Sequence, residues 1–181
     1  DRAQILAMVD RFLREDDRHR RATRTRPVAA EMRFGREGTE LDPIVVDLPD
    51  GRSLRFSGAV DRLDVADDGT IYVTDYKTGS SRSYKSLTPD DPDQQGTKLQ
   101  LAVYGQAARA FLDRPGASVR ADYWFVTDRE GYSRRGYEVD DQVLERVATS
   151  LTTIVEGIER GVFIPRPEDS TVPWVTCDFC D

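Results

Sequence analysis

Apolar residues recur along this chain with two different periods, which predicts a mixture of helices and strands. The first 21 residues carry apolar side chains at helical spacing, at Ile5, Met8, Val9, Phe12 and Leu13. Helical patterns also cover 97–113 and 140–161, and strand patterns cover 27–35, 42–51, 52–79 (a long hairpin), 117–128 and 131–139. No capping sequence precedes the first helix, so we expect the chain to be a piece of a longer protein.

The order of these elements predicts an α/β fold in which helices flank a central mixed β-sheet. Strands and helices do not alternate regularly, and the chain has no G-x-G-x-x-G motif, which argues against a doubly wound dinucleotide fold. We expect a single domain over 1–181, with an N-terminal helix and basic run at 1–26 and an irregular tail at 162–181. The polar segment 80–96 contains two prolines and is expected to be a mobile loop.

Composition narrows the class of protein. The chain has 181 residues, of which 38% are hydrophobic and 33% charged, enough for one buried core. No apolar run approaches the roughly 20 residues of a membrane span, and no signal peptide precedes Asp1. Two cysteines are too few for the disulfide framework of a secreted domain. We therefore expect a cytoplasmic protein without a membrane partner.

The charge pattern restricts the partners further. A formal net charge of −7 argues against a stand-alone nucleic-acid binder. Residues 18–26 nevertheless hold five arginines and the only histidine, His19. We interpret this run as the solvated end of a helix, with a phosphate-facing strip as the alternative. Only three of the 26 basic residues are lysines, so the lysine at position 77 suggests that a compact ammonium was required there.

The hairpin within 52–79 gathers charged residues at one end of an apolar face. If residues 67–69 form its turn, Asp61 faces Asp75 across the two strands. Because side chains alternate along a strand, Asp61, Asp75 and Lys77 then share the face that carries the apolar residues nearer the turn. A shift of the turn by one residue would take Asp61 off this face.

Two facing carboxylates on a core face repel each other, and a divalent cation between them removes that penalty. Hard cations such as Mg²⁺ or Mn²⁺ take oxygen ligands, commonly one or two carboxylates with waters and a substrate phosphate. We therefore predict an Mg²⁺ or Mn²⁺ site at Asp61 and Asp75, with Lys77 beside it. The alternative is an ion pair between Lys77 and Asp75, with Asp61 solvated at the sheet edge.

Three motifs, GAVDRLD (58–64), TDYKTG (74–79) and LQLAVYGQAA (99–108), stand in the order and spacing of a known family. Over about residues 27–181 the chain resembles the RecB-family nuclease domain of the PD-(D/E)XK superfamily. This domain occurs in bacterial helicase–nucleases that process DNA breaks and in CRISPR adaptation exonucleases. The resemblance implies a restriction-endonuclease-like core, with the catalytic core over 27–161.

The resemblance also implies roles for the residues of the hairpin. Asp61 and Asp75 match the two metal-binding aspartates of the family, and Lys77 matches its catalytic lysine. The backbone carbonyl of Tyr76 would complete the metal shell. The resemblance thus implies the metal site that the hairpin already predicts.

On the helices the match is partial. Gln100 and Tyr104 match the polar pair of the helix that follows the hairpin, and a spacing of four puts both on one face, toward DNA or the lysine. Taken singly, Gln100 would be an ordinary surface glutamine and Tyr104 a core residue. The family usually supplies a histidine ligand from an upstream helix. The only candidate is His19, which we expect on the surface; the ligand would then lie before Asp1, and this piece would be weak or inactive.

The C-terminal CDFCD resembles the CxxC of iron–sulfur members of the family, which hold a [4Fe–4S] cluster with four cysteines. Cys177 and Cys180 are the only cysteines here, and two thiolates cannot hold such a cluster. We expect half of a truncated site, with the cluster confined to the longer protein. A shared zinc ion or a redox-active pair is the alternative.

Together these observations predict metal-dependent hydrolysis of DNA, by an exonuclease rather than an endonuclease. We expect the nuclease module of a DNA repair or recombination helicase–nuclease. A helicase domain or subunit would supply most of the DNA affinity, which fits the acidic net charge. Two alternatives stay open: a RecB-like domain that has lost cleavage and serves as a DNA-binding or scaffold module, and a metal-dependent hydrolase of another phosphate ester.

Overall fold

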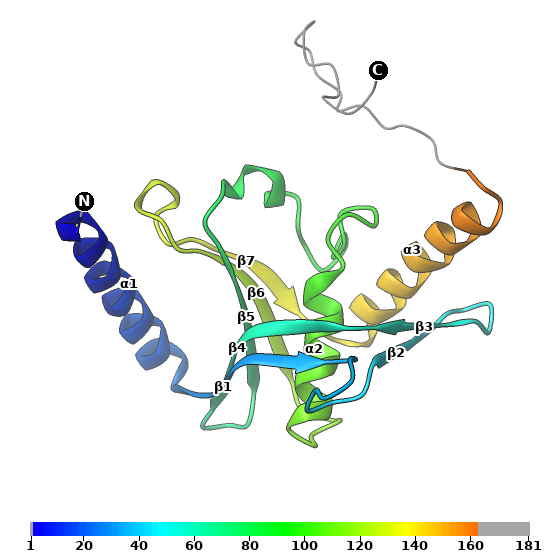
Figure 1. The fold of residues 1–181 in the computed structure, drawn as a ribbon, viewed down its shortest axis with the longest axis horizontal. Helices are drawn as coiled ribbons and strands as arrows, with labels where there is room; N and C mark the ends of the chain where they lie inside the picture. The colour runs from blue at the N-terminus through cyan, green and yellow to red at the C-terminus, as the bar shows by residue number, and fades with distance from the viewer. Residues whose placement is uncertain (1, 163–181) are drawn as a thin grey trace, which may run out of the picture.

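The computed structural model describes residues 2–162 and shows a mixed sheet with helices on both faces (Figure 1). In chain order its elements are α1 (Arg2–Thr23), β1 (Thr25–Phe34), β2 (Ile44–Asp47), β3 (Ser53–Phe56), β4 (Gly58–Ala66), β5 (Ile71–Lys77), the 3₁₀ helix η1 (Ser81–Tyr84), α2 (Gln100–Phe111), β6 (Val119–Phe125), the 3₁₀ helix η2 (Asp128–Glu130), β7 (Arg134–Glu138) and α3 (Asp141–Glu159). The predicted α/β class is confirmed. Within the described residues, no helix is long and apolar enough to cross a membrane.

The main sheet has the strand order β1-β4-β5-β6-β7, in which β5 and β6 are parallel and the other neighbours antiparallel. The long hairpin predicted over 52–79 is wrong in its first part, because Ser57 separates β3 from β4 and β3 pairs with β2 in a sheet of its own. Only β4 and β5 form a hairpin within that range. Its turn is as predicted: the amide of Ala66 donates to the carbonyl of Thr70, and Gly69 has the left-handed φ of 89° that the turn requires.

Helices α1 and α2 cover opposite faces of the sheet. The face under α2 buries Leu63, Val73 and Tyr123. The contacts of α1 with the sheet include Asp16 with Arg62 (2.6 Å) and, by ring centroids, Phe12 with Trp124 (5.0 Å) and His19 with Tyr72 (6.2 Å). Because Arg62, Tyr72 and Trp124 alternate with Leu63, Val73 and Tyr123 along β4, β5 and β6, they lie on the other face.

Local hydrogen bonds order the segments that precede α2 and α3. Asp140 caps α3 by accepting a hydrogen bond of 2.9 Å from the amide of Val143. Residues 80–96, expected to be a mobile loop, contain η1 and a set of internal hydrogen bonds, and their Leu87 and Asp93 are buried. This segment is therefore partly packed against the domain, and its mobility stays a prediction.

The strand β4 changes direction where the predicted site begins. Its ladder with β5 runs from Val65 to Arg62 and then stops, while its ladder with β1 continues to Gly58. Figure 1 shows the result: β5 rises steeply, and β1 and β4 cross in front of α2. Val60 and Leu63 are both buried although they are three residues apart, so the strand switches the face that it buries at Asp61. An angle between two diverging strands therefore opens at this residue.

We expect Gly136→Ala to destabilise the fold, because this glycine lies opposite Asp122 in the β6–β7 ladder. A Cβ atom there would overlap the carbonyl oxygen of Ala121 and lie 2.6 Å from Oδ1 of Asp122. Overpacking of this kind costs about 1–3 kcal/mol, which urea unfolding would measure. Gly116→Ala is the matched control, because its Cβ meets nothing within 4 Å. Equal stabilities of the two variants would contradict the close approach at Gly136.

Candidate active site

The end of β5 carries a buried carboxylate beside an ammonium. Asp75 points to the face under α2 and is only 4% exposed, and Nζ of Lys77 lies 2.5 Å from its Oδ2. That buried oxygen has no aligned hydrogen bond among the described residues. Burial raises the pKa of Asp75, the Lys77 ammonium lowers it, and the charge of Asp61 raises it again. The charge of Asp75 is thus compensated by one cation.

Asp61 reaches β5 from the point where β4 diverges. Its Oδ2 accepts a hydrogen bond of 2.7 Å from the backbone N–H of Tyr76, directly after Asp75. The β4–β5 register is the predicted one, and its last pair, Arg62 with Thr74, stands one step before Asp61 and Asp75. The ion pair of the alternative interpretation is present, but Asp61 is half-buried and bound to β5 instead of being solvated alone. The role of both carboxylates as metal ligands stays a prediction.

The polar pair on α2 continues this group of side chains. Nζ of Lys77 donates to Oε1 of Gln100 over 3.4 Å, and Nε2 of Gln100 donates to the hydroxyl of Tyr104 over 3.4 Å. Both bonds are long, so they orient the side chains more than they stabilise them. Burial raises the pKa of Tyr104, whose ring also contacts Phe34 of β1 at a centroid distance of 6.1 Å. The two residues therefore share a helix face toward the lysine, as the spacing of four predicts.

Tyr123 is the residue of this group that sequence reasoning missed. It lies on β6 directly beside Asp75 in the parallel ladder, and the centre of its ring is 5.1 Å from Nζ of Lys77. The side chain is fully buried, and its hydroxyl has no hydrogen-bond partner among the described residues. Its ring also stands at 4.8 Å from that of Tyr84 in η1. The strand pattern over 117–128 predicted the strand itself, but it held no signal for the neighbour across the sheet.

These donors suit a hard divalent cation. Asp61 and Asp75 offer carboxylate oxygens at one point, and the buried Oδ2 of Asp75 lacks an aligned hydrogen bond, as a ligand oxygen would in the free protein. Within residues 2–162, no three His, Cys, Asp or Glu side chains gather closely enough to hold a metal. A cation would therefore depend on the two aspartates and on backbone oxygens such as the carbonyl of Tyr76. Cys177 and Cys180 lie outside the described residues.

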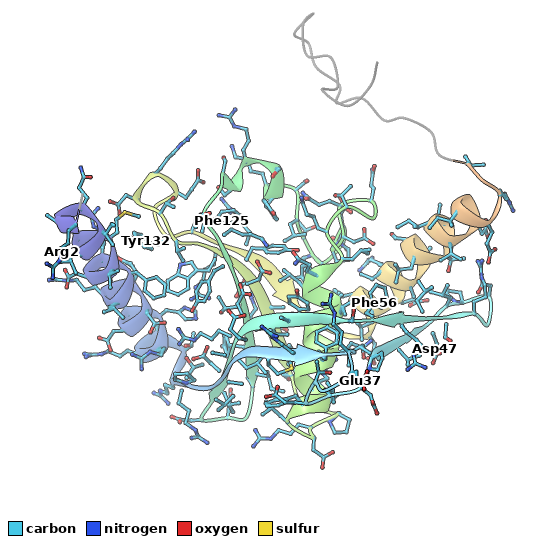
Figure 2. The ribbon with its side chains drawn as sticks, viewed as in Figure 1. Arg2, Glu37, Asp47, Phe56, Phe125 and Tyr132 are labelled. Carbon is cyan, nitrogen blue, oxygen red and sulfur yellow. The ribbon has the colours of Figure 1, made fainter. Side chains whose placement is uncertain are left out.

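His19 lies on the wrong face of the sheet for this site. Its ring packs on Tyr72 and Trp124, at centroid distances of 6.2 and 6.5 Å, under α1. The expected surface location holds in part: the ring is half-buried, because α1 docks on the sheet through this side. The turn after β6 holds the helix there: Arg11 pairs with Asp128 at 2.6 Å, and Figure 2 shows Tyr132 of that turn beside α1. The sheet separates His19 from Asp75.

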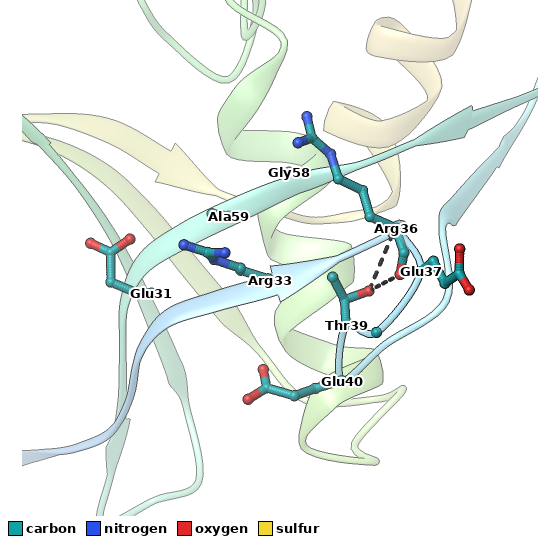
Figure 3. A pocket seen from close by; sticks show the side chains of 9 residues that line it. Glu31, Arg33, Arg36, Glu37, Thr39, Glu40, Gly58 and Ala59 are labelled. Atoms are coloured by element: carbon teal, nitrogen blue, oxygen red, sulfur yellow. Dashed lines mark hydrogen bonds between the residues drawn. The ribbon is translucent and has the colours of Figure 1, made fainter.

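A separate open cavity of about 680 Å³ lies against β1 and the loop that follows it (Figure 3). Its charged lining is mixed in sign: Glu31, Arg33, Arg36, Glu37 and Glu40. None of the predicted site residues lines this cavity. Asp61, Asp75, Lys77, Gln100 and Tyr104 instead lie together where β4 diverges from β5, beside α2.

A family model matches the whole chain, and individual known proteins match parts of it. A family model described as the PD-(D/E)XK nuclease superfamily matches residues 1–181. An ATP-dependent helicase/deoxyribonuclease subunit of Desulforudis audaxviator is 41% identical over 92 residues, covering 49% of this chain and 7% of that protein. Proteins of the same name from Clostridium kluyveri and Pelotomaculum thermopropionicum are 30% and 29% identical, covering 74% and 71% of this chain. The chain spans only 12% of the length of each of these two.

We expect His19→Asn to make the stability of the domain less sensitive to acid. Burial, with a further contribution from Arg134, lowers the pKa of His19 from 6.5 to about 4, although Asp122, Asp64 and Asp16 raise it. The unfolded chain then binds this proton first, so the stability from neutral His19 is complete above pH 6.5 and is lost as the pH falls toward 4. Urea unfolding at pH 7 and pH 5 measures the difference. Identical losses in wild type and variant would contradict the buried, neutral ring.

Proposed function

Because the chain belongs to the PD-(D/E)XK nuclease superfamily and has its restriction-endonuclease-like α/β core, we propose that it is an Mg²⁺- or Mn²⁺-dependent deoxyribonuclease, acting as an exonuclease. One observation carries the proposal: Asp61, Asp75 and Lys77 meet where β4 leaves β5. The relatives support DNA as the substrate, since they are named helicase/deoxyribonuclease subunits.

In the proposed hydrolysis of a phosphodiester bond, the residues of the site have different roles. Asp61 and Asp75, with the Tyr76 carbonyl, would hold the cation, which when bound offsets their charge and polarises a phosphate oxygen. Lys77 is one-quarter exposed, so its ammonium can donate to a phosphate oxygen while Asp75 and Gln100 fix its position. A positive charge fixed at this point stabilises the negative charge that develops on the phosphate in the transition state.

The parent protein is proposed to be a cytoplasmic helicase–nuclease of DNA repair or recombination. The relatives are named helicase/deoxyribonuclease subunits, and the chain spans 7–12% of their length. Most of such a protein lies beyond this domain, so a helicase portion or subunit would be its partner and would deliver DNA to it. A [4Fe–4S] cluster belongs to this proposal only for the longer protein, where further cysteines would complete the set begun by Cys177 and Cys180.

A second candidate function is a domain of the same family that binds DNA or acts as a scaffold without cleaving. The described residues favour it in one respect, because no histidine joins Asp61 and Asp75 at the site. The position of Lys77 argues for cleavage, because DNA binding alone does not require a lysine paired with a buried aspartate.

We expect Mn²⁺-dependent degradation of end-labelled single- and double-stranded DNA by the wild type. Lys77→Ala should reduce the rate by about 100-fold or more, the usual effect of removing a transition-state donor. Arg36→Ala, on the cavity of Figure 3, is the control and should cleave normally. Covalently closed circular DNA should resist degradation if the enzyme is an exonuclease.

Two results would contradict this assignment. Equal cleavage by wild type and Lys77→Ala would place the chemistry elsewhere. DNA binding without cleavage by the wild type would favour the second candidate function; an N-terminally extended chain then tests whether an upstream histidine restores activity.

Tyr123 should affect the reaction through Lys77, because its ring forms a cation–π contact with the ammonium group. We expect Tyr123→Phe, which keeps the ring, to retain most of kcat, and Tyr123→Leu to lower kcat by about 10-fold with little change in KM. A 10-fold loss corresponds to about 1.4 kcal/mol, within the range of a partly desolvated cation–π interaction. Steady-state cleavage kinetics measure both parameters. An equal loss in the two variants would assign the effect to the hydroxyl instead.

A further inference from the structure

The segment that leaves the active site after Lys77 has a distinctive composition. Residues 78–86, TGSSRSYKS, are here named the cationic strap. They contain two cations, Arg82 and Lys85, and five aliphatic hydroxyls, but no carboxylate. In a chain with a net charge of −7, such a stretch beside the candidate lysine is unexpected from composition alone.

The cationic strap turns its cations outward with a period of three. Ser81 and Leu87 are buried, and Tyr84 between them packs on the rings of Tyr123 and Phe125. This is the spacing of a 3₁₀ helix, which η1 begins and which the turn from Tyr84 O to Leu87 N continues at 3.2 Å. The side chains flanking these inward positions are all exposed: Ser80, Arg82, Ser83, Lys85 and Ser86.

The cationic strap is also fixed relative to the active site. The amide of Ser81 donates to Oε2 of Glu130 at 2.9 Å, the one carboxylate that contacts the strap among the described residues. Tyr84 contacts Tyr123, whose ring carries Lys77, and Nζ of Lys98 lies 4.5 Å from the Tyr84 ring on another side. The backbone that carries Arg82 and Lys85 is therefore anchored at Ser81 and at Tyr84, which packs on the same Tyr123 ring that Lys77 contacts.

The two cations of the cationic strap, Arg82 and Lys85, form no ion pairs with carboxylates among the described residues, whereas most arginines of α1 do. On α1, by contrast, every arginine but the first pairs with a carboxylate: Arg11 with Asp128, Arg14 with Asp10, Arg18 with Glu15, Arg20 with Asp16 and Arg21 with Asp17. Three of the five arginines in the run at 18–26 are thus paired on the helix itself, whereas Arg24 and Arg26 form no ion pair among the described residues. An unpaired cation binds an external anion without first breaking an internal pair.

We propose that the cationic strap binds the sugar–phosphate backbone of the DNA strand next to its scissile phosphate, through Arg82 and Lys85. Arginine, lysine, serine and threonine side chains are common donors to phosphate oxygens, and such contacts position a strand without reading its sequence. The inference rests on the proposed nuclease function and adds the path of the substrate: along 78–86, not along α1.

The test compares two variants that each remove two positive charges, Arg82→Ala/Lys85→Ala and Arg18→Ala/Arg21→Ala. Anisotropy of a labelled single-stranded oligonucleotide, with Ca²⁺ in place of Mn²⁺, gives the affinity between 25 and about 200 mM salt. Each lost phosphate contact lowers the slope of log K against log salt by about 0.7. We expect the strap variant to lose about 1.4 from the slope, bind about 10-fold more weakly at low salt, and cleave with a raised KM. The α1 variant should match the wild type, and Arg82→Lys/Lys85→Arg should restore binding.

Three outcomes would overturn the inference, and they are distinguishable. An unchanged slope in the strap variant, with normal cleavage by the wild type, removes the strap from the DNA path and leaves the nuclease function intact. A larger loss in the α1 variant moves the path to the basic run at 18–26. Absence of both binding and cleavage in the wild type overturns the nuclease proposal and this one together. Unchanged unfolding midpoints in both variants exclude misfolding as the cause.

Discussion

Asp75 occupies a position on β5 where the alternation of the strand calls for an apolar side chain, as at Ile71 and Val73 before it. A carboxylate at this depth loses most of its hydration, and its raised pKa records that loss. The ammonium of Lys77 compensates only part of it, because one buried oxygen still lacks an aligned hydrogen bond. The other contacts of the lysine, with Gln100 and the ring of Tyr123, keep this cation in place. The site therefore sacrifices some stability to hold charge where solvent is scarce, which is the usual property of a site that binds a ligand.

The divergence of β4 from β5 allows Asp61 and Asp75 to lie near each other without being paired in the ladder. If the antiparallel ladder continued past Arg62, Asp61 would lie directly across from Asp75. The two carboxylates would then repel each other within the sheet and destabilise it. Instead β4 follows β1 across α2, and the carboxylate of Asp61 is held by the amide of Tyr76. The left-handed φ of 52° at Glu31, in β1 beside this point, accompanies the change of direction. The two carboxylates thus lie where the strands diverge, and α2 adds the polar pair Gln100 and Tyr104 next to Lys77.

Sequence reasoning succeeded where the contacts are local and failed where they are not. The register of β4 and β5 follows from a short turn with a left-handed Gly69, so Asp61, Asp75 and Lys77 could be brought together from the sequence. Tyr123 could not be added, because β6 joins β5 through a parallel crossover that carries α2 and leaves no pairing signal. The split of β3 from β4 was missed for a similar reason, since its partner β2 lies outside the hairpin. The face that His19 occupies depends on where α1 docks, which no periodicity determines.

The net charge of −7 is an average over a molecule whose charges are unevenly paired. Most arginines on α1 form ion pairs, whereas Arg82 and Lys85, which follow Lys77 along the chain, form none among the described residues. Because charges are screened beyond about 10 Å at 0.1 M salt, a bound strand would sense mainly the groups beside it. If the cationic strap binds the strand as proposed, the domain has little long-range attraction for DNA and meets the strand through local contacts. The proposed delivery of the strand by a larger protein fits this arrangement, because cleavage would then depend on delivery more than on free encounter.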